Sequence, residues 1–153
     1  MSRYIFYFSL CAILLSACSP STTVPLGTPI PPEQEKVWTI KMEQSGGIMG
    51  LSRSIEISSD GNFTVTDQRT DKTVKGQLSA YELTSLRELV TTAKLASIPP
   101  TEETGCADCF IYNLEIQGKG EPISVQLNDV TLPDSGLGSL VVFLRGLMDR
   151  SLM

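Results

Sequence analysis

The sequence of 153 residues contains no histidine. Imidazole is the usual general base of enzymes and the usual nitrogen ligand of zinc. Its absence excludes His-based acid–base catalysis, a Ser-His-Asp triad and His-ligated zinc. The carboxylates form no catalytic pair, because Glu102-Glu103 lies in a predicted loop and Glu43 and Glu56 lie on outer strand faces. We therefore expect a protein that is not an enzyme and that binds neither a cofactor nor a metal.

Basic residues are also scarce, with 12 Lys and Arg against 17 Asp and Glu. They form no patch along the sequence. Nucleic-acid binding depends on clustered Lys and Arg that face phosphates. Nucleic acid is therefore not an expected partner.

The chain has no apolar run of about 20 residues, the length that a membrane-spanning helix needs. Its longest run is Tyr4–Leu15, which follows Arg3 and leads into Leu15-Ser16-Ala17-Cys18. This layout is typical of a secretory signal peptide. Leu-Ser-Ala-Cys also resembles the lipobox of bacterial lipoproteins, which implies cleavage before Cys18 and a lipid on its sulfur. A plain secretory signal with an ordinary cleavage site is the rival interpretation.

These features divide the sequence into three parts. Residues 1–17 are the expected lipoprotein signal peptide, 18–35 the lipidated Cys18 and a tether rich in Pro, Ser and Thr, and 36–153 one folded domain. Loss of Arg3 with the signal leaves 11 basic and 17 acidic residues, a net charge of −6. We expect an extracytoplasmic protein whose membrane partner is reached through the lipid on Cys18, on the cell membrane or an outer membrane.

Two cysteines remain for the domain, because Cys11 leaves with the signal and Cys18 takes the lipid. Cys106 and Cys109 form a Cys-x-x-Cys motif. In an oxidising compartment this spacing predicts a short-loop disulfide. A redox pair, a metal site and free thiols are the alternatives. The strand-like residues after Cys109 argue against a redox pair, whose reactive thiol usually starts a helix.

Hydrophobic periodicity predicts the order β-β-β-β-α-β-β-α, an α+β domain in which an antiparallel sheet has two helices packed on one face. The expected strands are Val37–Glu43, Leu51–Ser58, Phe63–Thr66, Thr73–Leu78, Phe110–Gln117 and Ile123–Leu127. A capping box at Ser79 and Glu82 starts the first helix, which is expected to end near Ala96. Asp134 or Ser135 is expected to cap the second, whose apolar stripe contains Leu137, Leu140, Val141, Leu144, Leu147 and Met148.

The connection between the first two strands is the oddest local feature. Ser45, Gly46, Gly47, Ile48, Met49 and Gly50 place two bulky apolar residues among glycines at a hairpin tip. Such a tip is either packed back onto its own sheet or presented to a partner.

This loop also carries a family resemblance. Trp38-Thr39-Ile40, the Ser45–Leu51 segment and Arg53 resemble the opening of the emfourins, small protein inhibitors of thermolysin-like metalloproteases such as protealysin. Asp108 and Tyr112 match the family's Asp-x-x-x-Tyr strand motif. Ile48 stands where an aromatic is usual. The resemblance implies an α+β fold and reversible occlusion of a protease cleft by the loop from Ser45 to Gly50.

Two other functions follow from the same residues. A non-enzymatic envelope lipoprotein would use the domain as an interaction or assembly module. A redox protein would use Cys106 and Cys109 as exchanging thiols.

Overall fold

The computed structural model describes residues 37–95, 106–118 and 121–153. The expected signal peptide, Cys18, the tether and Glu102-Glu103 lie outside these residues. The strands are β1 (Thr39–Gly46), β2 (Leu51–Ser58), β3 (Asn62–Asp67), β4 (Lys72–Gln77), β5 (Phe110–Gln117) and β6 (Ile123–Asn128). The helices are α1 (Ala80–Leu95), the short 3₁₀ helix η1 (Pro133–Ser135) and α2 (Gly138–Leu152).

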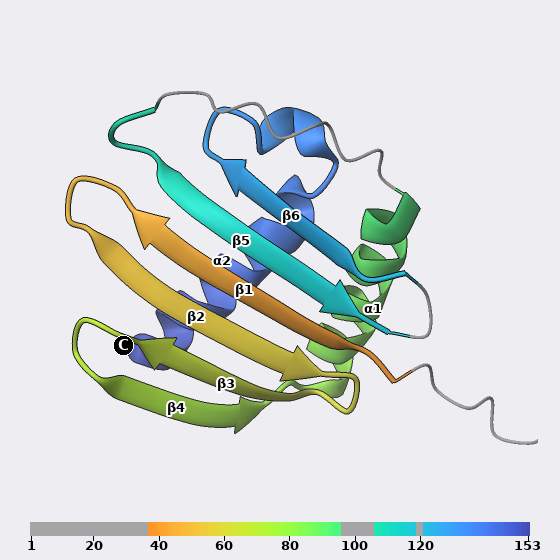
Figure 1. Ribbon diagram of the computed structural model, residues 1–153. Helices are drawn as coiled ribbons and strands as arrows, with labels where there is room; N and C mark the ends of the chain where they lie inside the picture. The colour runs from red at the N-terminus through yellow and green to blue at the C-terminus, as the bar shows by residue number, and fades with distance from the viewer. Residues whose placement is uncertain (1–36, 96–105, 119–120) are drawn as a thin grey trace, which may run out of the picture. The chain divides into compact units, whose positions relative to one another are not determined.

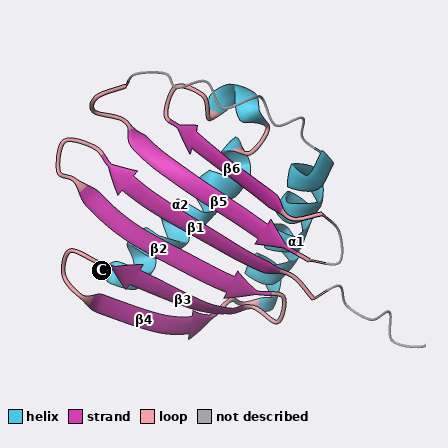
Figure 2. Cartoon of the chain, viewed as in Figure 1, coloured by secondary structure: helices cyan, strands magenta, loops and turns pink. Residues whose placement is uncertain are grey.

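The six strands form one sheet in the order β4-β3-β2-β1-β5-β6, and every neighbouring pair is antiparallel (Figure 1). Short hairpins join β1 to β4 in sequence. After α1 the chain returns on the other side of β1, so β1 lies inside the sheet between β2 and β5. Helices α1 and α2 cover the same face of the sheet (Figure 2). The predicted α+β fold and its order of elements are confirmed.

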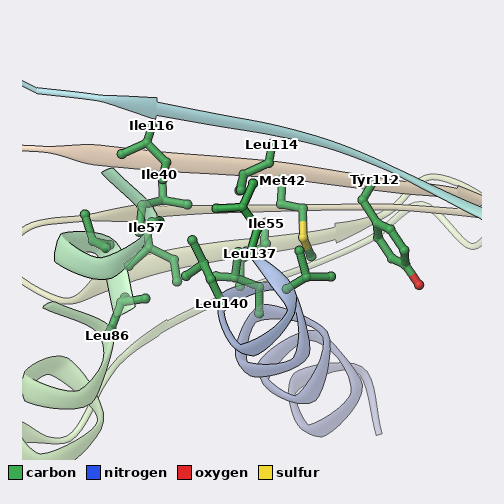
Figure 3. Packing of buried hydrophobic residues seen from close by; sticks show 14 of the residues in the cluster. Ile40, Met42, Ile55, Ile57, Leu86, Tyr112, Leu114, Ile116, Leu137 and Leu140 are labelled. Carbon is green, nitrogen blue, oxygen red and sulfur yellow. The ribbon is translucent and has the colours of Figure 1, made fainter. Parts of the chain in front are cut away.

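Alternation along the strands separates a helix-covered face from an open one. In β1, Ile40 and Met42 are buried while Lys41 is exposed. Glu56 points to the open face of β2, as predicted. Figure 3 shows the side chains of the sheet meeting those of the two helices in one apolar cluster. The buried members from the strands include Ile55, Ile57, Val65, Leu114, Ile116, Val125 and Leu127.

Helix α1 begins with the predicted capping box. The Ser79 hydroxyl accepts a hydrogen bond from the Glu82 backbone N–H at 3.3 Å, and the Ser79 N–H donates to Glu82 Oε2 at 3.0 Å. These bonds satisfy backbone donors that a helix start leaves without partners. Leu86, Val90 and Ala93 then face the core.

The predicted start of the second helix was wrong. Asp134 and Ser135 belong to η1, Gly136 has a left-handed φ of 70°, and α2 begins at Gly138 with no side-chain cap. Ser135 instead stabilises the turn, because its hydroxyl donates to Leu132 O at 2.7 Å and accepts from Leu137 N–H at 3.0 Å. The two cases look alike in the sequence, because a serine hydroxyl can bond to nearby backbone groups either in a turn or at the start of a helix. The predicted apolar stripe of α2 is buried throughout.

The capping box makes a prediction about stability. Replacing Ser79 by Ala removes the cap and should lower the free energy of unfolding by about 1 kcal/mol. Chemical denaturation measures this change. Thr84→Ala is the matched control, since the exposed Thr84 hydroxyl only donates back to Ala80 O within α1 and Ala favours the helix. An equal loss in both variants would contradict a specific role for the cap.

Candidate functional site at the loop end of the sheet

Four connecting segments gather at one end of the sheet, here called the loop end (Figure 1). They are the β1–β2 connection, the β3–β4 turn, the segment that enters β5 and the segment that leaves β6. In sequence they are residues 47–50, 68–71, 106–109 and 129–132. The loop end therefore brings the glycine-rich loop and the cysteine motif side by side, although they lie about 60 residues apart in the sequence.

The glycine-rich loop is shorter than predicted. Ser45 and Gly46 belong to β1, where they pair with Ser52 and Leu51 of β2. The connection itself, here called the tip, is Gly47–Gly50, and the Gly50 N–H closes it by donating to Gly47 O at 2.9 Å. The pairing extends because Gly46 also lies opposite Phe110 of β5, so that strands on both sides hold the end of β1.

The tip presents its two apolar side chains to solvent. Ile48 is 90% exposed and Met49 is 75% exposed. The alternative of a tip packed back onto its own sheet is therefore wrong. Two more exposed apolar residues belong to the same end of the sheet, Ile111 at the start of β5 and Val130 after β6. Because these four exposed apolar side chains belong to one end of the sheet, the loop end is the candidate interaction surface.

The base of the tip rests on the peptide unit that joins Cys109 to Phe110. The Gly47 N–H donates to Cys109 O at 3.1 Å. A Cβ on Gly46 would lie 2.5 Å from that carbonyl oxygen, and a Cβ on Gly47 would lie 2.5 Å from the Phe110 ring. Both glycines have positive φ, 90° and 70°. Glycine is required here for close approach as well as for turning.

The cysteine motif lies next to the tip, which it contacts through Cys109 O. Cys106 and Cys109 are joined by a disulfide, with their Cα atoms 5.5 Å apart. The bond closes a turn through Ala107 and Asp108, both exposed. Asp108 of the Asp-x-x-x-Tyr motif thus lies at the surface, whereas Tyr112 is fully buried. Asp108 is therefore accessible to a partner, whereas Tyr112 contacts only the interior of the domain.

Three polar side chains, here called the relay, hold the other side of the same peptide unit. Arg145 Nη1 of α2 donates to the Tyr112 hydroxyl at 3.0 Å, and that hydroxyl donates to Asp129 Oδ1 at 2.9 Å. Asp129 Oδ2 accepts the Phe110 N–H at 2.8 Å. The Arg145 guanidinium also lies over the rings of Phe110 and Tyr112, with its Cζ 5.5 Å and 5.7 Å from their centroids. The relay connects helix α2 to the base of the tip.

The outer side of the tip is held by Arg69 from the β3–β4 turn. Its Nη1 donates to Met49 O at 2.6 Å, and its backbone N–H donates to Asp67 Oδ1 at 3.0 Å. Hydrogen bonds from a charged donor are stronger than those between neutral groups. The carbonyl of Met49 and the amide of Gly47 are therefore both fixed, and the side chains between them point outward.

A second contact of α2 lies one helical turn beyond Arg145. Asp149 Oδ1 accepts a hydrogen bond from Arg53 Nη1 at 2.9 Å, and Arg53 Nε lies 3.7 Å from Asp67 Oδ2. Gln44, opposite both Arg53 and Tyr112 in the sheet register, is also buried. The helix-covered face is thus apolar along most of its length and polar at the loop end.

Sequence patterns did not predict most of this polar support. Arg53 and Tyr112 were indicated only by the family resemblance, and no pattern indicated Arg69, Asp129 or Arg145. One usable signal was present, because Gln44 and Asp67 occupy core-facing positions of the strand alternation. A polar residue at such a position predicts a buried partner. The pattern does not identify that partner, which comes from a different element.

Burial and the hydrogen bond to Asp129 raise the pKa of Tyr112 to about 12, although the nearby charge of Arg145 opposes the rise. The hydroxyl therefore stays protonated and acts as a donor at neutral pH. Within residues 37–95, 106–118 and 121–153, no group of three or more Cys, Asp and Glu side chains is placed to hold a metal ion. The contacts found at the loop end hold the backbone of the tip from both sides.

No protein-family model matches the chain, and no curated protein matches it. The resemblance to the emfourins therefore stays a prediction.

The raised pKa of Tyr112 predicts a pH dependence. A tyrosine in the unfolded chain has a pKa near 10. Because the folded state binds the Tyr112 proton more tightly, this proton stabilises the fold fully below pH 10. The stabilisation is lost as the pH rises from 10 toward about 12. In Tyr112→Phe this loss should be absent, and its deficit in unfolding free energy, roughly 1–3 kcal/mol at neutral pH, should shrink between pH 10 and 12. Urea denaturation across this range measures both curves.

Tyr81→Phe is the matched control, because Tyr81 is exposed on α1. Its stability should follow that of the unmodified protein at every pH. Parallel curves for the unmodified protein and Tyr112→Phe would contradict the assignment of the alkaline loss to Tyr112.

Proposed function

We propose that this protein is a lipid-anchored extracytoplasmic inhibitor of thermolysin-like metalloproteases that acts by reversible occlusion of the protease cleft. The observation that supports it most is the exposure of Ile48 and Met49 on a tip whose backbone is fixed on both sides. The resemblance of the Ser45–Leu51 segment to the emfourin loop supplies the class of target.

The proposed inhibition is non-covalent. A thermolysin-like cleft favours bulky apolar side chains beside its zinc, and Ile48 and Met49 supply two of them. Each apolar side chain transferred from water into such a pocket contributes roughly 1.5–3 kcal/mol. A tip already held by Cys109 O and Arg69 loses little conformational entropy on docking. A flexible substrate segment lacks this advantage.

The membrane anchor in this proposal is the lipid on Cys18. None of the helices in the described residues is long and apolar enough to cross a bilayer. A lipid and the Pro-rich tether would place the domain on the outer side of the cytoplasmic membrane, where secreted proteases are met.

A second candidate is an interaction or assembly module of the cell envelope. It is favoured by Ile111 and Val130, which are exposed apolar residues of the loop end outside the tip. A pocket-filling inhibitor needs only the tip, whereas a broader partner would contact all four residues. The partner, rather than the surface, distinguishes these two functions.

A variant series tests the proposed function. A soluble form that begins at Lys36 is titrated against a panel of thermolysin-like proteases, and inhibition is expected at micromolar concentrations or below. Ile48→Asp should weaken it at least about 100-fold, because a carboxylate would be desolvated in an apolar pocket. Gly47→Arg should weaken it as well, since a side chain there would strike the Phe110 ring and disturb the tip.

Val142→Asp is the control for a lost exposed apolar residue, because Val142 is 62% exposed on α2 and lies outside the tip. Its inhibition constant should match that of the unmodified domain. Absence of inhibition across the panel would refute the protease proposal for those enzymes. Equal inhibition by Ile48→Asp and the unmodified domain would refute the role of the tip.

A further inference from the structure

We propose that the Cys106–Cys109 disulfide is a redox modification site, cleaved by a dithiol, that controls the order of the tip. The inference deepens the proposed function by giving it a regulator, and it rests on that function only for its effect on a protease.

The disulfide lies where a reductant can reach it. Cys106 is exposed and Cys109 is half-buried, and the residues between them are exposed. A thiolate of the dithiol attacks the Cys106 sulfur, breaks the bond between the two cysteines and expels the Cys109 thiolate, which takes up a proton. The second thiol of the dithiol then attacks the dithiol sulfur that is bonded to Cys106 in this mixed disulfide. The attack closes the disulfide of the reductant and releases Cys106 as a thiol. The protein disulfide gains two electrons and two protons, and the dithiol is oxidised to a disulfide.

The coupling to the tip is a direct backbone contact. Cys109 is a disulfide cysteine, and its carbonyl oxygen accepts the Gly47 N–H at 3.1 Å. The same oxygen packs against Gly46 with no room for a Cβ. Any turn of the Cys109 carbonyl therefore either breaks the bond to Gly47 or displaces the end of β1.

Constraints act on that carbonyl from both sides. The first is the disulfide, which holds the Cys109 residue on its amino-terminal side. The second is the set of contacts of the following residue, Phe110, whose N–H donates to Asp129 and which pairs with Gly46 in the sheet. Reduction removes the first constraint and leaves the second. The peptide between Cys109 and Phe110 then turns while its N–H stays bonded to Asp129, and the hydrogen bond from the Gly47 N–H to Cys109 O is broken for part of the time.

The effect of reduction is local. A disulfide that closes so short a loop contributes little to global stability, because the unfolded chain loses little freedom to it. The apolar core lies between the sheet and the helices, and neither cysteine belongs to it. Reduction should therefore loosen the tip and leave the fold intact, which is the behaviour that a switch requires.

Amide hydrogen exchange of the full chain in detergent, followed by NMR with and without dithiothreitol, tests the inference. Exchange of the Gly47 amide should become at least about tenfold faster on reduction. The Ile55 amide, within the β2 ladder, is the internal control and should not change. The double variant Cys106→Ser/Cys109→Ser should exchange like the reduced protein in both conditions.

Unchanged exchange at Gly47 would overturn the inference, because Asp129 and the pairing of Phe110 with Gly46 would then hold the peptide without the disulfide. A general acceleration that includes Ile55 would also overturn it, since the disulfide would then support the whole fold.

The protease experiment uses the double variant instead of dithiothreitol, because dithiols bind zinc and would inactivate the enzyme directly. The variant should inhibit about tenfold more weakly than the oxidised protein. If the oxidised protein inhibits none of the proteases but Gly47 responds to reduction, the proposed function fails and the switch stands. If the oxidised protein inhibits and the variant is equally potent, the regulatory effect is refuted.

Discussion

The loop end depends on one peptide unit, the bond between Cys109 and Phe110. Its carbonyl accepts the Gly47 N–H, and its N–H donates to Asp129. A trans peptide is planar, so its carbonyl and its N–H turn together. The tip, the disulfide and the relay from α2 all meet at this unit. A change at the disulfide is therefore expected to reach the tip, while the contact between Asp129 and the Phe110 N–H stays.

The contacts between sheet and helices differ along the sheet, and this difference explains how an exposed apolar tip coexists with a stable domain. The apolar cluster between sheet and helices supplies stability. At the loop end the same face turns polar, and α2 contacts it through Arg145 and Asp149, which lie one turn apart. These charged contacts fix direction as well as distance, because hydrogen bonds are directional whereas apolar contacts are not. The domain can therefore present Ile48 and Met49 without using them for folding.

Local patterns predicted the fold, because most strands and both α-helices have a clear hydrophobic period. Alternation in β1 and the stripe of α2 both matched the structure, and the Ser79 capping box was found where it was expected. The second helix start failed because Ser135 serves a turn that looks like a cap. The tip was recognised from its glycines. Its supports were not, since Arg69 and Asp129 reach the tip through pairings between strands that no local pattern specifies.

The central claim is that the tip is rigid before it meets a partner, and backbone ¹⁵N relaxation of the oxidised protein tests it most directly. Order parameters for Gly47 and Ile48 should be near 0.85, the value of rigid backbone. Values below about 0.6, as in flexible loops, would contradict the account, because the bonds from Gly47 to Cys109 and from Arg69 to Met49 would then not hold the tip in solution.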